Sequence, residues 1–168
     1  MVSCHLVHFL LVLVISSPAA AAERRQAQSR PAMPGGLRST PVVCPTEDEV
    51  KVAGTFTPAA VHTGQRAPVA ILLHTYGSDR TVWDPLVPAL HAAGFAVLAI
   101  DFRGHGETTG PEGMQLSRRS EKKDTRLFRQ MYKDVKGAYN WLTTRNDVDL
   151  ARFVLIGCGL GCSVAIDC

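Results

Sequence analysis

Three short segments built only from apolar residues constrain the fold of this chain more than any other feature. They span residues 69–73, 95–100 and 153–156. Such segments are typical of strands buried on both faces, the usual condition in a parallel sheet covered by helices. Helical patterns separate the three segments along the chain. The order therefore predicts an α/β fold with a mostly parallel sheet, helices on both faces and right-handed crossovers.

Other elements are predicted from residue periodicity and from helix-capping residues. Residues 49–56 alternate between polar and apolar side chains, as in a strand near the edge of a sheet. Asp84 is expected to cap a helix that ends at Gly94. Residues 102–123 have no clear period and are predicted to form a long loop, and a short helix is expected over residues 160–168. A longer amphipathic helix is indicated by apolar residues at three- and four-residue steps: Leu127, Met131, Val135, Ala138 and Leu142.

The N-terminal region is predicted to lie outside the folded domain. Residues 1–22 contain no Asp, Glu, Lys or Arg, and they carry an apolar run followed by small residues, which is typical of a secretory signal peptide. This predicts a secreted or periplasmic protein; a membrane anchor is the second interpretation, although the run is shorter than the roughly 20 residues of a membrane span. Residues 23–45, rich in arginine, proline and glycine, are predicted to form a disordered linker. Residues 46–168 then form one partial domain.

The charge distribution argues against a nucleic-acid partner. The formal net charge is +3, and residues 23–45, with four arginines and one glutamate, account for all of it. The folded part is therefore neutral overall and shows no basic groove.

The cysteines leave disulfide pairing open. Four follow the predicted signal peptide, so three pairings are possible in an exported chain. Cys158 and Cys162 flank a glycine turn that is expected to be buried, where cysteine commonly acts as a small hydrophobic residue. The spacing of the last three cysteines matches no familiar zinc pattern, so we expect no metal site and no cofactor. The four are Cys44, Cys158, Cys162 and Cys168.

A glycine turn follows the third apolar segment. Gly157, Gly159 and Gly161 alternate there, which is similar to the nucleophile elbow G-x-S-x-G with glycine in place of the serine. The alternative is a dinucleotide-binding turn, G-x-G-x-x-G. Its first two glycines fit, but Cys162 takes the third position, and the acidic ribose contact expected roughly 20 residues further on is absent.

Three motifs together carry a family resemblance. The segments I-L-L-H-T-Y-G at residues 71–77, D-F-R-G-H-G at residues 101–106 and the turn at residues 157–161 occur in the order and spacing of the α/β-hydrolase superfamily. The chain from about Glu49 onward resembles the N-terminal half of such a protein. The resemblance implies a lineage of serine ester or amide hydrolases. It also implies that the main-chain amides of Tyr76 and Leu160 are the candidate oxyanion-hole donors.

Departures from the family pattern predict a catalytically inactive protein. Thr75 stands where the family commonly has glycine, and Gly159 stands where the nucleophilic serine should be. The triad acid and histidine of the family follow the elbow helix, whereas only seven residues follow Gly161 in this sequence. No catalytic residue is therefore expected to be intact. His74 and His105 are interpreted as hydrogen-bonded loop residues rather than bases.

Two neighbouring residues also receive a structural interpretation. Asp101 is expected to cap the loop that follows it, and Cys158 is not expected to replace the nucleophile.

Three alternatives to an active enzyme stay open. The chain could bind a small carboxylate or ester in the residual oxyanion cleft. It could be an incomplete gene product. The strand at residues 153–156 is also expected to expose an apolar edge, which would favour self-association or pairing with a completing chain.

Overall fold

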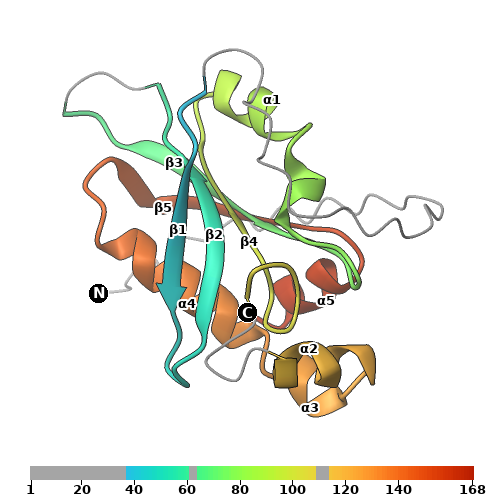
Figure 1. Ribbon diagram of the computed structural model, residues 1–168. Helices are drawn as coiled ribbons and strands as arrows, with labels where there is room; N and C mark the ends of the chain where they lie inside the picture. The colour runs from blue at the N-terminus through green and yellow to red at the C-terminus, as the bar shows by residue number, and fades with distance from the viewer. Residues whose placement is uncertain (1–36, 61–63, 109–113) are drawn as a thin grey trace, which may run out of the picture.

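The computed structural model describes residues 37–60, 64–108 and 114–168. The signal peptide predicted for residues 1–22, and the linker as far as residue 36, lie outside these ranges. The described residues form one five-stranded sheet flanked by helices (Figure 1). None of the helices in these ranges is both long and apolar enough to cross a membrane.

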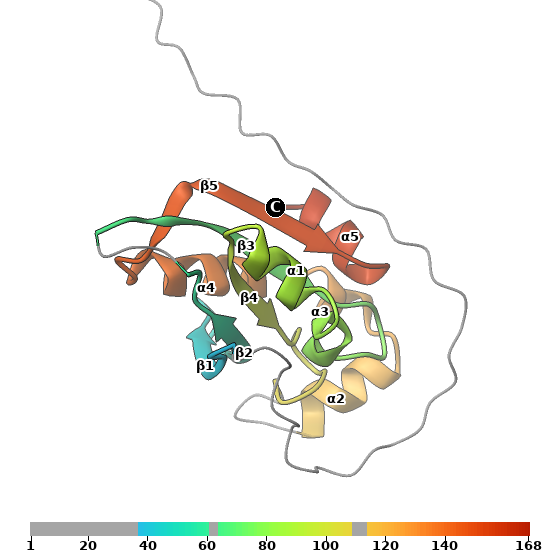
Figure 2. The same ribbon diagram turned by 90° about the horizontal axis from the view of Figure 1, so that it is seen from above.

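The sheet has the strand order β1-β2-β4-β3-β5. β1 pairs antiparallel with β2, β2 pairs antiparallel with β4, and β3 runs parallel to both β4 and β5. Seen from above, β5 lies at one margin of the sheet and β1 and β2 lie at the other (Figure 2). The three apolar segments are thus the parallel strands, as predicted. The strands are β1 (Thr40–Pro45), β2 (Lys51–Thr57), β3 (Ala67–Leu73), β4 (Ala96–Ile100) and β5 (Val148–Gly157).

Helices cover both faces of the sheet. Alternate residues of β3 and β4 point to opposite faces, so Leu72 packs with Val87 on one side, and Ile71 packs with Val135 on the other. η1 and α1 cover the first side, and α4 and α5 cover the second. The helices are η1 (Arg80–Trp83), α1 (Val87–Ala92), α2 (Met114–Glu121), α3 (Thr125–Phe128), α4 (Tyr132–Thr143) and α5 (Leu160–Ile166).

The linker prediction was wrong for its last residues, because Thr40–Pro45 form strand β1. β1 is an edge strand, and an edge strand tolerates proline because one side of its backbone needs no hydrogen bond from a neighbour. Cys44 on this strand is fully buried in the core. The folded domain therefore begins before residue 46.

Two helix predictions also need correction. Asp84 does not cap a helix at its N-terminus; it follows η1, and Asp79 is the capping residue of η1, accepting a hydrogen bond from the Thr81 amide at 2.8 Å. α1 begins only after Leu86 and ends before Gly94, whose φ of +84° confirms the predicted end. Proline at the second position of α1 fits the first turn of a helix, where an amide hydrogen is not needed.

The segment predicted as a long loop, residues 102–123, contains helix α2. Its charged residues have adequate helix propensity but show no extended apolar stripe, so periodicity did not reveal it. The amphipathic helix predicted from Leu127 to Leu142 is divided into α3 and α4. The five apolar residues that defined it are buried, as predicted.

Candidate active site

The site is organised by the turn from β5 into α5. Gly159 lies at its centre with φ +54° and ψ −113°, a strained conformation that side-chain-bearing residues rarely adopt. A Cβ atom added at Gly157 would lie 2.5 Å from the carbonyl carbon of Gly161. One added at Gly161 would lie closer than 3.0 Å to the Leu73 carbonyl. The outer glycines are therefore required by the close approach of strand and helix, as in a nucleophile elbow.

The end of β3 lies beside this turn. The amide of Cys158 donates a hydrogen bond of 3.1 Å to the Leu73 carbonyl, which extends the contact between β3 and β5 into the turn. This places half-buried Thr75 over Gly159. A Cβ atom at position 159 would lie closer than 3.0 Å to the Thr75 hydroxyl oxygen. The hydroxyl of Thr75 thus fills the space where a nucleophile side chain would begin.

His74 joins the loop after β3 to the loop after β4. Its Nε2 accepts a hydrogen bond from the Phe102 amide at 3.0 Å, so Nδ1 carries the proton and donates to the Thr75 carbonyl at 2.7 Å. The side chain is fully buried, and burial lowers its pKa to about 4. His74 is therefore neutral and fully hydrogen-bonded, which confirms the interpretation as a loop residue.

His105 is also hydrogen-bonded at both ring nitrogens. Its Nδ1 donates to the Arg103 carbonyl at 3.2 Å, and its Nε2 accepts from the Ser120 hydroxyl at 3.1 Å. Burial lowers the pKa of His105 as well. Neither histidine of the two loop motifs has a ring nitrogen left to take a proton from a substrate.

Asp101 caps the loop after β4, as predicted. Its Oδ2 accepts the Glu107 amide at 2.9 Å, and its Oδ1 accepts the Arg80 amide at 2.7 Å. A side chain at Gly106 would collide with the Asp101 carboxylate, which explains the glycine there. The sequence did not reveal that Arg80, only 5% exposed, also forms an ion pair with Asp101.

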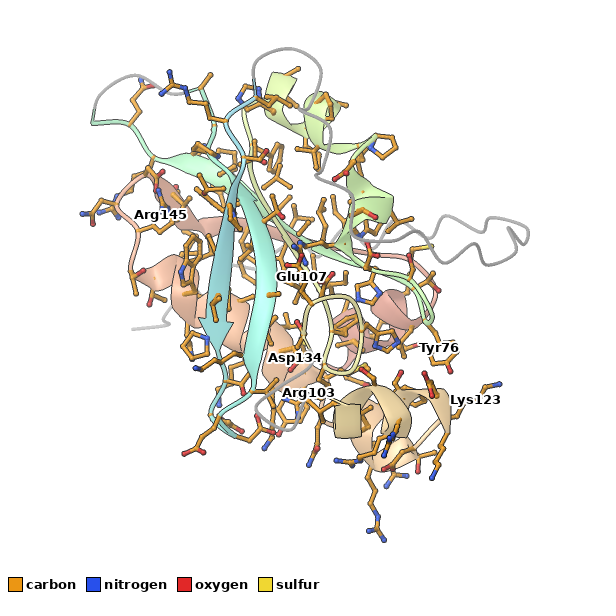
Figure 3. All side chains as sticks on the ribbon, in the orientation of Figure 1. Tyr76, Arg103, Glu107, Lys123, Asp134 and Arg145 are labelled. Carbon is orange, nitrogen blue, oxygen red and sulfur yellow. The ribbon has the colours of Figure 1, made fainter. Side chains whose placement is uncertain are left out.

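A second buried ion pair fixes Arg103, the middle residue of the loop motif. Asp134 on α4 accepts the Arg103 amide at 2.8 Å and its guanidinium at 2.8 Å, and Asp48 binds the same guanidinium at 2.8 Å (Figure 3). Burial raises the pKa of Asp134 to about 6, against the opposing effect of Arg103. The sequence carried one signal for this pair: Asp134 lies three residues after Met131, on the apolar stripe of the predicted helix.

Each of the two candidate oxyanion donors directly follows one of the two residues of the Thr75–Gly159 contact in the sequence. The main-chain amides of Tyr76 and Leu160 make no hydrogen bond to another residue within the described ranges. The Tyr76 ring leans over α2, and its hydroxyl donates to the Ser120 carbonyl at 3.1 Å (Figure 3). Their role as donors stays a prediction.

A polar cavity of 260 Å³ opens beside Tyr76. The loop after β3, the loop after β4 and helix α2 all contribute to its wall, and among the described residues the elbow at 157–161 does not line it. Its polar side chains are those of Tyr76, Ser78, Asp79, His105, Ser117, Ser120 and Glu121.

No disulfide joins the cysteines of the described residues. Cys158 packs against the apolar cluster on the α1 side of the sheet, and the Cys162 thiol donates to the Gly157 carbonyl at 3.0 Å. Both observations fit the small-hydrophobe interpretation. Among the residues that the structure places, no group of three potential ligands could hold a metal ion.

The sheet order and the glycine turn after β5 define an α/β-hydrolase architecture. A model of the alpha/beta hydrolase family matches residues 70–167, and the chain belongs to this family. The match spans all three motifs of the site, and it favours the elbow over the dinucleotide-binding turn.

Similar proteins include curated and structurally solved relatives. The uncharacterized protein Rv2307c of Mycobacterium tuberculosis is 32% identical over 126 residues, which are 74% of this chain and 39% of that protein. The Pyrococcus furiosus esterase Pf2001 is 29% identical with a TM-score of 0.60, covering 78% of this chain and 46% of that one.

An epoxide hydrolase from an endophytic Streptomyces shares the fold at 19% identity and a TM-score of 0.55, covering 77% of this chain and 32% of that one. The chain thus spans less than half the length of each of these three proteins.

Proposed function

We propose that this chain derives from serine ester or amide hydrolases and that, with the residues it carries, it has no serine-hydrolase turnover. One observation carries the proposal: position 159 has the elbow backbone but no side chain, and the Thr75 hydroxyl fills the adjoining space. An acyl-enzyme needs a nucleophilic atom on the elbow residue. Esterase similarity supports the lineage, and the epoxide hydrolase likeness shows that the fold alone does not fix the substrate.

The neighbouring side chains do not supply a substitute. Cys158 packs on the α1 side of the sheet, and the Cys162 thiol is bonded to the Gly157 carbonyl. His74 and His105 are neutral and bonded at both ring nitrogens. A nucleophile at the elbow would therefore find no base in the two loop motifs.

A fluorophosphonate probe tests the inactivity directly. The purified chain and the Pyrococcus furiosus esterase are incubated with the probe in parallel, and intact-protein mass is measured. We expect no stoichiometric adduct on this chain. Stoichiometric labelling at any residue of the native chain, abolished by heat denaturation, would show that an activated nucleophile exists and would overturn the proposal.

The second candidate is a non-catalytic binding protein for a small carboxylate or ester. The 260 Å³ cavity favours it, because Tyr76, the residue that carries one of the two candidate amide donors, lines this cavity. Titration with acetate, butyrate and their ethyl esters is expected to raise the melting temperature saturably, as any ligand specific for the folded state does. A melting temperature that does not move with ligand concentration would exclude this function for these compounds.

We further propose that residues 1–22 direct export of the chain. The support is their sequence alone, with an apolar run and then small residues. Expression in a secreting host, followed by N-terminal sequencing of the exported product, is expected to give a start near Glu23. A membrane-bound product that retains Met1 would favour the anchor instead.

A further inference from the structure

The contact between Thr75 and Gly159 is tight enough to exclude one side chain or the other. A Cβ atom on position 159 would lie 3.2 Å from the Thr75 Cβ and closer than 3.0 Å to its hydroxyl oxygen. Real Cβ atoms essentially never come within 3.0 Å of another heavy atom. The two departures from the family pattern are thus the two sides of one contact.

Hydrogen bonds to its main-chain carbonyl hold Thr75 in this position. Its carbonyl accepts from His74 Nδ1 at 2.7 Å and from the Ser78 amide at 3.3 Å. One residue before His74, the Leu73 carbonyl is bonded to the Cys158 amide at 3.1 Å, so the two segments cannot separate without breaking that bond. The loop therefore cannot move aside at low cost.

Rotation of the Thr75 side chain gives little relief. The three staggered rotamers place the hydroxyl, the methyl group or the Cβ hydrogen in turn toward position 159. Only the last removes the collision with an atom beyond Cβ, and it leaves the two Cβ positions 3.2 Å apart, tighter than nine in ten Cβ contacts. A side chain at position 159 therefore fits without displacing Thr75 only when position 75 holds a smaller residue.

We propose that Thr75 determines which side chain position 159 can carry. The Thr75 hydroxyl, on the loop after β3, takes the space of a nucleophile side chain on the elbow, so the elbow is closed to a nucleophile while Thr75 is present. The proposal rests on the proposed function for the assignment of the turn as an elbow. Its consequence is specific: introducing a nucleophile at position 159 exposes it only when Thr75 is also replaced by glycine.

Thermal unfolding of a double-mutant cycle tests the steric coupling. The variants are Gly159→Ser, Thr75→Gly and both together, with Gly94→Ser as the control, because Gly94 also has a positive φ but no atom near its Cβ position. We expect Gly159→Ser to lower Tm by at least about 5 °C more with Thr75 present than in the Thr75→Gly background. In that background its effect is expected to be similar to that of Gly94→Ser. Additive Tm changes would overturn the proposal.

Alkylation of an introduced thiol provides a second test that needs no catalysis. Gly159→Cys is combined with Thr75, Thr75→Gly or Thr75→Val, and iodoacetamide labelling at position 159 is followed by peptide fragmentation, which separates it from Cys158 and Cys162. We expect labelling about 10-fold faster with Thr75→Gly, and slow labelling with Thr75→Val, whose methyl group has the size of the hydroxyl. Equal rates in all three would contradict the proposal.

The two proposals fail in different ways. Fluorophosphonate labelling of the native chain would contradict the proposed inactivity, but it would leave the proposed coupling between positions 75 and 159 untouched. Additive Tm changes and equal alkylation rates would contradict the proposed coupling, but they would leave the proposed inactivity untouched.

Discussion

Two loops at the carboxyl ends of the parallel strands are held in shape by opposite means. The elbow after β5 depends on missing side chains, because Gly157 and Gly161 allow strand and helix to touch. The loop after β4 depends on buried charges, because Asp101 forms an ion pair with Arg80 and Arg103 forms one with Asp134. An elbow built this way keeps its backbone when the nucleophile is absent, so its chemistry can be lost without loss of the fold.

The largest expected effect removes the basis of the elbow. Gly161→Ala is expected to destabilise the protein by about 4 kcal/mol or more, because the new Cβ would collide with the Leu73 carbonyl, a backbone atom that cannot turn away. Gly77→Ala is the control: Gly77 has a φ of +71°, unlike Gly161, but no atom lies near its Cβ position, so only the backbone cost of about 1 to 2 kcal/mol is expected. Urea denaturation measures both. Equal losses would mean that close packing does not shape the elbow.

The corresponding test of the charged loop is Asp134→Asn. Loss of this carboxylate leaves the Arg103 guanidinium, 1% exposed, without its most buried partner, and about 3 to 5 kcal/mol of stability is expected to be lost. Lys136→Gln, on the same helix but in an exposed pair with Glu47, is expected to leave the urea midpoint unchanged. A small effect at Asp134 would break the contrast between the two loops.

His74, which joins the loop after β3 to the loop after β4, predicts a pH dependence of stability. Its folded-state pKa of about 4 lies below its ordinary value of 6.5, so the unfolded chain takes up the proton first. The contribution of neutral His74 to the free energy of unfolding is fully present above about pH 6.5. It is lost as the pH falls to 4, and the total loss is about 3 kcal/mol.

The measurement compares unfolding free energies of the wild type and His74→Gln between pH 4 and pH 7. Asp134, whose pKa is raised to about 6, contributes with the opposite sign in this range, but it is present in both proteins and cancels in the difference. The gap between the two curves is expected to narrow as the pH falls. A constant gap would show that His74 is not held neutral by burial.

The sequence predicted the elbow better than the charged loop, for a physical reason. Part of the steric requirement is local, because Gly157 packs against Gly161 of the same turn, and the glycine spacing is visible in the sequence. The short apolar segments likewise favour buried strands. The ion pairs are not local, since Asp48 and Asp134 reach Arg103 from segments 55 and 31 residues away. A charged residue in a sequence does not state its partner.

Helix α2 and the Thr75 contact escaped prediction for related reasons. Residues 114–121 lack the apolar stripe by which packing usually reveals a helix. Thr75 and Gly159 are each visible as departures from the family pattern, but their contact depends on the register between β3 and β5, which pairs Leu73 with Gly157. Register is a property of the fold rather than of either motif.

The smallest expected effect concerns the unpaired edge of β5, the strand that leads into the elbow. Among the residues described, β5 pairs only with β3, and an apolar cavity of 420 Å³ lies between α4, β5 and α5. We propose that copies of the chain associate weakly through this edge, as unpaired strand edges tend to do. Light scattering over a concentration series is expected to show a rise in mean mass. Ile166→Lys, at a side chain 70% exposed on the cavity wall, is expected to reduce that rise without lowering Tm. A constant monomer mass would show that this edge, unlike the elbow beside it, has no consequence for the isolated chain.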